Sequence, residues 1–247
     1  MEGLKEKNGM IHGRFQPFTI GHMEHLKKAI NQIEKGNTIF VGITKPFITD
    51  NGKSKGDDHR DNKVSNPYTF EERKEMVLRS VEKDPEIQDR IDDICVIPWS
   101  MNNEEERNAI IEEYMPKKDV IQFMNIIPND GWEYEKKQIL EDLGFKTKNL
   151  VDPFRPRKTS ATEVRTLRKN KDQNWTKKVP EGTKEVLEEI NKGTLKLYST
   201  NSVREYLELL IKTKEIANIS LPRNSHEQEI VDKVKRKMGK EENTIER

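Results

Sequence analysis

The chain has 247 residues, 32% hydrophobic and 36% charged, and its 45 basic and 44 acidic residues leave a net charge of +1. This length suits one domain of moderate size, or one domain with a small appendage. The balanced charge argues against a nucleic-acid-binding protein, which would normally concentrate basic charge on one face. The sequence has no run close to the about 20 apolar residues of a membrane span, and no apolar secretory signal. Its single cysteine, Cys95, excludes an internal disulfide and a metal site built on thiolates. We therefore expect a soluble, cytoplasmic protein without nucleic-acid or membrane partners.

Five short apolar segments alternate with amphipathic stretches, the pattern typical of a parallel sheet with helices between its strands. The predicted strands are residues 10–12, 38–43, 94–98, 120–124 and 145–151. A helix is expected after the first strand, where Met23, Leu26 and Ile30 recur at helical spacing and Gly36 supplies a stop.

Capping patterns mark the start of later helices. Thr69 with Glu72, and Ser160 with Glu163, each match the capping box, so helices are expected just after Thr69 and Ser160. Other predicted helices span residues 104–114, 133–143, 181–191 and roughly 226–239. The polar segment 45–66 has no clear period and is predicted to be a mobile loop that could cover a cleft.

These elements predict an α/β fold, a Rossmann-like, doubly wound parallel sheet of five strands, followed by a small C-terminal helical extension. We expect the nucleotide-binding domain in residues 1–181 and the extension in residues 182–247. In such sheets ligands bind at the carboxyl ends of the strands, where the strand order reverses.

The segment 13–22, Gly-Arg-Phe-Gln-Pro-Phe-Thr-Ile-Gly-His, follows the first predicted strand and leads into a helix. Its glycines, Gly13 and Gly21, allow backbone amides to approach an anionic ligand, and His22 adds an imidazole donor at the helix start. A histidine at a helix start is more often structural, so this segment alone is a weak signal.

The segment 160–165, Ser-Ala-Thr-Glu-Val-Arg, opens another predicted helix. The hydroxyls of Ser160 and Thr162 and the guanidinium of Arg165 are donors suited to the outer phosphates of a nucleoside triphosphate. Ser160 would also serve as an N-cap with no ligand at all. Taken together, the two segments predict one shared nucleotide-binding site.

These segments, with Asn-Pro-Tyr-Thr-Phe-Glu-Glu-Arg at 66–73, resemble the nucleotidyltransferase superfamily that carries a His- or Thr-x-Gly-His motif. The resemblance is greatest to the archaeal-type nicotinamide-nucleotide adenylyltransferases, whose Gly-Arg-Phe-Gln-Pro-Phe is matched at every position of 13–18. The likeness spans about residues 10–190.

The resemblance implies adenylyl transfer, in which a phosphate of the acceptor attacks the α-phosphorus of ATP and pyrophosphate leaves without a covalent enzyme intermediate. His22, Thr19 and Arg165 would be the catalytic residues. The nucleotide-binding residues it implies are Gly13, Arg14, Phe15, Gly21, Arg73, Ser160 and Thr162. Mg²⁺ would bridge the phosphates of ATP without dedicated protein ligands, and the family suggests a homo-oligomer.

The acceptor is less well defined, because the aspartate that archaeal members carry after the third strand is absent from the stretch 98–104. Thr19 also replaces the first histidine of the motif. The expected acceptor-binding residues are Trp99, Asn102, Asn125 and Trp132. For the two tryptophans, stacking on an acceptor ring and ordinary packing both remain open.

The preferred function is therefore transfer of AMP from ATP to a phosphorylated acceptor, nicotinamide mononucleotide (NMN) first. One alternative is a cytidylyl- or adenylyltransferase that acts on a sugar or polyol phosphate. A second alternative is a non-catalytic nucleotide sensor that binds the ligand without turnover.

Overall fold

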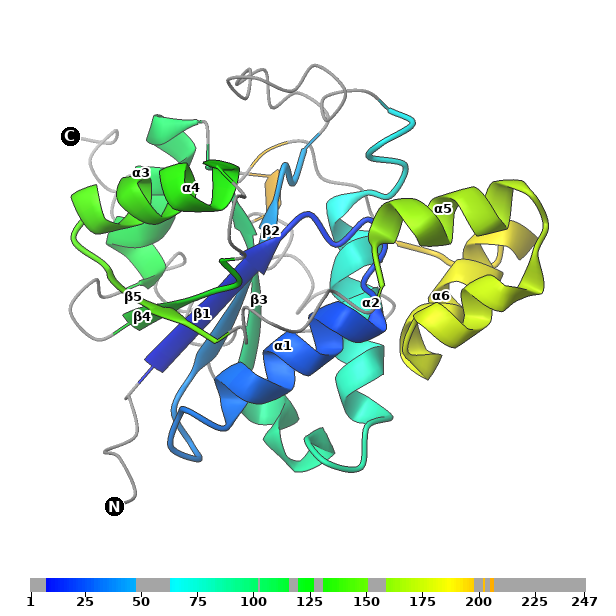
Figure 1. Cartoon of the computed structure of the whole chain (residues 1–247), viewed down its shortest axis with the longest axis horizontal. Coiled ribbons are helices and arrows are strands. Elements are labelled where there is room, and N and C mark those ends of the chain that lie inside the picture. Colours follow the sequence, from blue (N-terminus) through cyan, green and yellow to red (C-terminus); the bar gives the residue numbers. More distant parts are fainter. Residues whose placement is uncertain are drawn as a thin grey trace, which may run out of the picture.

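Five parallel strands form one sheet in the order β3-β2-β1-β4-β5 (Figure 1). The computed structural model describes residues 8–47, 63–101, 103–115, 120–126, 131–150, 159–197, 202 and 205–206. The strands are β1 (Asn8–Gly13), β2 (Ile39–Thr44), β3 (Ile94–Trp99), β4 (Val120–Met124) and β5 (Lys146–Asn149). The chain adds β2 and β3 on one side of β1 and then returns to its other side, so the strand order reverses between β1 and β4. The predicted doubly wound, five-stranded parallel sheet is confirmed.

Helices cover both faces of this sheet, with α3 and α4 on one side and α1 and α2 on the other (Figure 1). The α-helices are α1 (Ile20–Ile30), α2 (Phe70–Glu82), α3 (Glu104–Tyr114), α4 (Gly131–Asp142), α5 (Ala161–Lys169) and α6 (Glu181–Lys192). Two 3₁₀ helices, η2 (Gln88–Asp93) and η4 (Gln173–Lys178), were not expected from the sequence. Within the described ranges, no helix has the length and apolar character needed to cross a membrane.

The strands differ in burial according to their position. Every residue of β3 and β4 is buried, and Cys95 lies inside this core. The edge strand β5 is mostly exposed and is shorter than the predicted 145–151. Phe145, which is buried, lies just before the strand begins.

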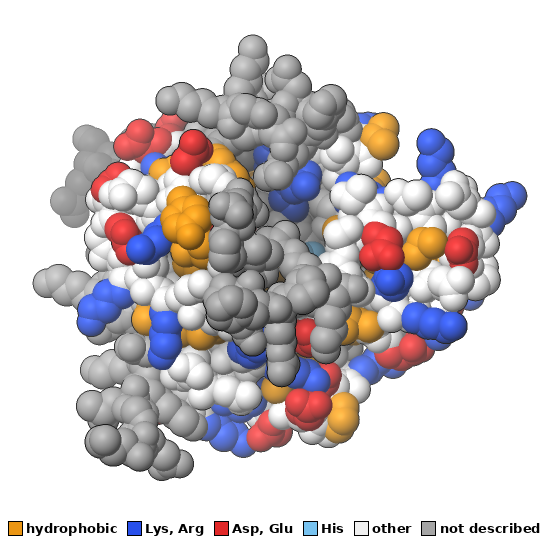
Figure 2. All heavy atoms as spheres, viewed as in Figure 1, with side chains coloured by type: hydrophobic (Ala, Val, Ile, Leu, Met, Phe, Trp, Pro, Cys, Tyr) orange, Lys and Arg blue, Asp and Glu red, His pale blue; other side chains and the backbone are white. Residues whose placement is uncertain are grey.

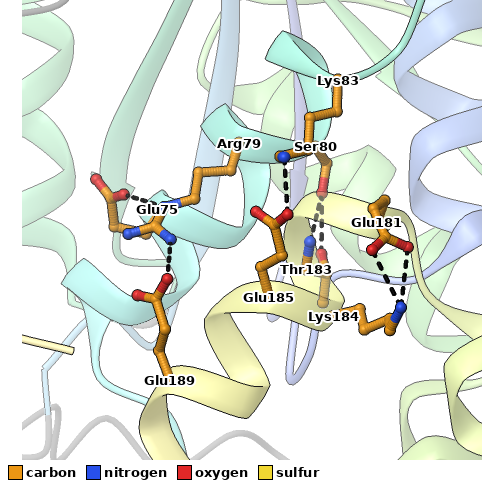
Figure 3. Close-up of polar contacts among 9 residues, drawn as sticks. All are labelled: Glu75, Arg79, Ser80, Lys83, Glu181, Thr183, Lys184, Glu185 and Glu189. Carbon is orange, nitrogen blue, oxygen red and sulfur yellow. Dashed lines mark hydrogen bonds and ion pairs between the residues drawn. The ribbon is translucent and has the colours of Figure 1, made fainter. Parts of the chain in front are cut away.

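Helix α6 packs closely on α2 through Gly182. A Cβ atom at this position would lie 2.2 Å from the backbone carbon of Arg79 and 2.3 Å from the backbone nitrogen of Ser80. Next to it, the buried Thr183 donates its N–H to Ser80 Oγ at 3.1 Å, and ion pairs including Lys83 to Glu185 flank the contact (Figure 3). The first helix after the predicted boundary at residue 181 therefore rests directly on α2.

Farther along the chain, Tyr206 also lies against this part of the core. Its buried ring meets Phe70 edge-on at 5.1 Å between centroids, and its hydroxyl is 3.3 Å from Lys74 Nζ. Most of the predicted extension, including the helix expected at 226–239, lies outside the described residues, as does most of the loop predicted at 45–66. The division into two units stays a prediction.

Gly182→Ala is expected to destabilise the protein by about 2–3 kcal/mol, because the added methyl group must push apart two backbones rather than a flexible side chain. Chemical denaturation monitored by circular dichroism measures this change. Gly131→Ala is the matched control, since a Cβ at Gly131 meets nothing within 4 Å. Equal stabilities of the two variants would contradict a close backbone contact at Gly182.

Candidate active site

Helix α1 begins with a capping box that fixes the orientation of His22. The N-cap residue Thr19 donates its backbone N–H to His22 Nδ1 at 3.0 Å, and the Thr19 hydroxyl accepts the His22 backbone N–H at 3.4 Å. A ring nitrogen that accepts an N–H carries no proton, so the neutral imidazole has its proton on Nε2. The cap therefore selects the tautomer whose donor is Nε2–H.

Two aromatic rings hold the imidazole in place. Phe15 meets it edge-on at 5.0 Å between centroids, and Phe18 lies at 5.7 Å. A Cβ at Gly13 would be 2.9 Å from the Phe15 ring, so this glycine is needed to let Phe15 pack. Phe15 itself has a φ of 50°, in the left-handed region that bulky residues rarely adopt. Gly13 and Phe15, predicted as nucleotide-binding residues, thus support His22 with their packing.

The second motif touches the first at two points. The backbone N–H of Gly21 donates to Thr159 Oγ1 at 3.2 Å, across 138 residues of sequence, and Arg165 donates to the carbonyl oxygen of Gln16 at 2.5 Å. Arg165 also donates to Thr162 Oγ1 at 3.1 Å. In Figure 1 the start of α5 accordingly lies beside the chain that joins β1 to α1. The structure therefore brings the start of α5 against the loop after β1 and the first turn of α1, which carries His22.

Two residues in this junction had no role in the sequence prediction. Gln16 is buried, and its side-chain amide exchanges two hydrogen bonds with the backbone of Tyr68, at 2.9 and 3.0 Å. Thr159 directly precedes the N-cap of α5. Gln16 lies within the first motif and Thr159 directly before the second, so their position in or beside a motif was the available signal.

The N-termini of α1 and α5 both contribute to the electrostatics of this junction, because unpaired amides at a helix start favour anions. Ser160 caps α5 by accepting the Glu163 N–H at 3.1 Å, while the Glu163 carboxylate pairs with Lys178 at 2.8 Å. Partial burial lowers the pKa of Arg165 from its usual value. Figure 2 shows basic side chains and a histidine in the hollow between the α3–α4 side and the α5–α6 side. The arrangement is suited to an anion with several phosphates.

Arg73 differs from its predicted role as a phosphate contact. Its side chain is 1% exposed, and its pKa is lowered by burial to about 9, so it is charged at neutral pH. Its guanidinium makes hydrogen bonds of 2.8–3.1 Å to five backbone carbonyls, those of Arg14, Thr44, Lys45, Pro46 and Thr69. These bonds use all five N–H donors of the group. Arg73 therefore ties the loop after β1 to the loop after β2 and has no donor left for a phosphate.

The structure describes three of the four predicted acceptor-binding residues. Trp99 is 0% exposed, and its indole nitrogen lies 3.0 Å from Met101 Sδ, so the packing interpretation holds for it. Asn125 follows β4 and Trp132 lies in the first turn of α4, both half-buried, and their contacts with an acceptor stay predictions. Asn102 lies outside the described residues. Arg14 is half-buried, and the role of its side chain also stays a prediction.

Residues 10–167 match a family described as cytidylyltransferase-like, a range that starts in β1, ends in α5 and contains both motifs. The chain belongs to the cytidylyltransferase-like family. The matched range includes all five strands of the parallel sheet except the first two residues of β1.

The chain is also similar to individual proteins of known name. The nicotinamide-nucleotide adenylyltransferase of Thermococcus sibiricus is 27% identical over 204 residues, which cover 81% of this chain and 94% of that protein. The phosphonoformate cytidylyltransferase of Streptomyces viridochromogenes is 44% identical over 69 residues, 28% of this chain and 36% of that protein. A crystal structure of a bifunctional NMN adenylyltransferase/ADP ribose pyrophosphatase from Francisella tularensis matches with a TM-score of 0.48 and 16% identity, over 87% of this chain and 56% of that one.

Proposed function

We propose that the protein is a nucleotidyltransferase that transfers AMP from ATP to NMN and releases pyrophosphate. The observation that carries the proposal is the junction of the two motifs: Arg165 donates to Gln16 in the loop after β1, and that loop leads into the first turn of α1, where His22 has a fixed Nε2–H donor. The similarity to the Thermococcus sibiricus adenylyltransferase over nearly the whole length of that protein supports ATP and NMN as the substrates.

The chain's own groups supply positioning and charge neutralisation. His22 Nε2–H would donate to the α-phosphate as negative charge builds on its oxygens during in-line attack by the acceptor phosphate. Arg165, Ser160 and Thr162 would bind the outer phosphates, which leave as pyrophosphate. No side chain needs to form a covalent bond, so the rate enhancement comes from holding two anions in line.

The site fits Mg²⁺ as a partner of ATP. Among the described residues, no group of three or more His, Cys, Asp or Glu side chains is arranged to hold a metal ion. Mg²⁺ needs no such group when phosphate oxygens and water supply most of its ligands, and the Ser160 hydroxyl would lie beside those phosphates. When bound, the ion would neutralise charge on the triphosphate.

A second candidate keeps the chemistry and changes the substrates. The local 44% identity to a phosphonoformate cytidylyltransferase favours CTP and a small phosphorylated or phosphonate acceptor. The missing aspartate after β3 is consistent with an acceptor site that departs from that of the archaeal adenylyltransferases.

Pyrophosphate release distinguishes these candidates. The protein is incubated with Mg²⁺, either ATP or CTP, and a panel of acceptors that includes NMN, phosphonoformate, and sugar and polyol phosphates. We expect release with ATP and NMN together, and not with either alone. Release only with CTP or another acceptor would favour the second candidate, and nucleotide binding without release in every mixture would favour a sensor.

A further inference from the structure

Tyr68 connects three segments that meet at the junction of the two motifs. It directly precedes Thr69, the N-cap of α2, and its backbone exchanges two hydrogen bonds with the Gln16 side chain, at 2.9 and 3.0 Å. Its hydroxyl accepts a hydrogen bond from Arg168 of α5. The Tyr68 side chain is buried, so water competes little for these bonds. One residue therefore links the loop after β1, the start of α2 and helix α5.

Arg168 holds the same part of α5 against its other neighbours. Its guanidinium donates to Asn191 Oδ1 at 2.8 Å and to the Leu187 carbonyl oxygen at 3.3 Å, both in α6. It also lies 5.3 Å from the ring centroid of the buried Trp175 in η4. The bond to the Tyr68 hydroxyl joins this group of helices to the motif junction.

Arg165 lies one turn before Arg168, and residues three apart on a helix are neighbours on its surface. Arg165 donates to the Gln16 carbonyl oxygen at 2.5 Å and to Thr162 Oγ1 at 3.1 Å. A guanidinium has five N–H donors, so these two bonds to described residues leave three donors for phosphate oxygens. Together with the bond from Arg168 to Tyr68, the contacts close a ring through the loop after β1, the start of α2 and α5.

The Tyr68 hydroxyl keeps its proton at neutral pH. Burial, the largest cause, raises its pKa above the ordinary value, while the nearby charges of Arg168 and Arg165 act in the opposite direction. A neutral hydroxyl accepts the Arg168 N–H without placing a negative charge beside Arg165. The contact therefore fixes α5 and leaves the positive charge of Arg165 available to a polyanion.

Building on the proposed function, we propose that Tyr68 and Arg168 are positioning residues, which hold α5 in the orientation that aims Arg165 at the outer phosphates of the nucleotide. Neither residue touches the reacting atoms. The Gln16 side chain fixes Tyr68 to the loop, and the Tyr68 hydroxyl fixes α5 to Tyr68. A displacement of about 1 Å in a phosphate-binding group can cost about 100-fold in rate, so loss of this one bond should be measurable in phosphate binding.

Tyr68→Phe tests the inference because it removes the hydroxyl and keeps the ring. We expect the Kd and the KM for ATP to rise about 10-fold, and the KM for pyrophosphate in the reverse reaction to rise in parallel. The KM for NMN should change by less than about 2-fold, because Arg165 is assigned to the outer phosphates of ATP. Tyr134→Phe, at a 53% exposed position of α4, is the matched control and should leave all three constants unchanged.

A double-mutant cycle distinguishes positioning of Arg165 from a general structural role. In an Arg165→Lys background, Tyr68→Phe should raise the Kd for ATP by less than about 2-fold, because the group that it positions is already gone. Arg168→Met removes the other end of the same bond, so combining it with Tyr68→Phe should add little to the effect of Arg168→Met alone. Each Kd is measured by isothermal titration calorimetry at a temperature at which circular dichroism shows the variant to be folded.

The outcomes separate this inference from the function on which it rests. An unchanged Kd for ATP in Tyr68→Phe, or an equal rise with and without Arg165→Lys, would overturn the positioning role, and the proposed function would stand if NMN is turned over. If the unaltered protein binds ATP but does not turn over NMN, the proposed function is wrong, and the series of Kd values still decides the inference. An unaltered protein that does not bind ATP would overturn both.

Discussion

His22→Ala is expected to lower kcat by about 100- to 1,000-fold while the Kd for ATP changes little. The reason is that Nε2–H acts on charge that develops at the α-phosphate only in the transition state, and removal of one such donor costs about that factor. Steady-state kinetics gives kcat, and isothermal titration calorimetry gives the Kd for ATP. His25→Ala, one turn farther along α1, is the matched histidine control and should keep nearly normal turnover.

A second substitution separates the loss of the donor from the loss of the helix cap. The His22 ring also closes the capping box of α1 by accepting the Thr19 N–H, so His22→Ala removes a cap as well, at a cost of about 1 kcal/mol. Glutamine is a regular third residue of a capping box. His22→Gln should therefore keep the stability of α1 but lose turnover. Equal losses of ATP binding and of turnover in these variants would contradict the assigned role of Nε2–H.

The regular elements could be predicted because their signals are local. The strand 120–124 and the helix 104–114 have the predicted bounds, and Thr69 caps α2 through the expected box with Glu72. At Ser160 only one hydrogen bond of the predicted capping box forms: the Ser160 hydroxyl accepts the Glu163 N–H, while the Glu163 carboxylate pairs with Lys178. Lys178 lies in η4, a short helix without a periodic apolar pattern, so the sequence did not indicate this ion pair.

The sequence predicted which residues belong to the site better than it predicted what each residue does there. Gly13, Gly21 and His22 stood out because their types and spacing are unusual at the end of a strand. What each does depends on partners distant in sequence: Gly13 makes room for the Phe15 ring, and Gly21 donates to Thr159.

Arg73 is the clearest case of a residue whose role depends on partners distant in sequence, and its replacement has the largest expected effect on stability. Arg73→Met should lower the free energy of unfolding by about 3–5 kcal/mol, because it removes a buried charged donor and leaves several carbonyls without partners. Urea denaturation measures this. Lys83→Met, at the C-cap of the same helix, is the control, since its ion pair with Glu185 is exposed and worth about 1 kcal/mol or less.

Arg73→Lys then distinguishes a loop clamp from a phosphate contact. Lysine keeps the positive charge but has three donors at one point and cannot reach carbonyls from three separate segments. If Arg73 clamps the loops, Arg73→Lys should lose most of the stability that Arg73→Met loses, and ATP affinity should fall only as far as the folded fraction falls. If Arg73 binds a phosphate, lysine should preserve the fold and the change should appear in the Kd for ATP. A stable Arg73→Lys protein with weakened ATP binding would therefore overturn the clamp and restore the phosphate contact that the sequence predicted.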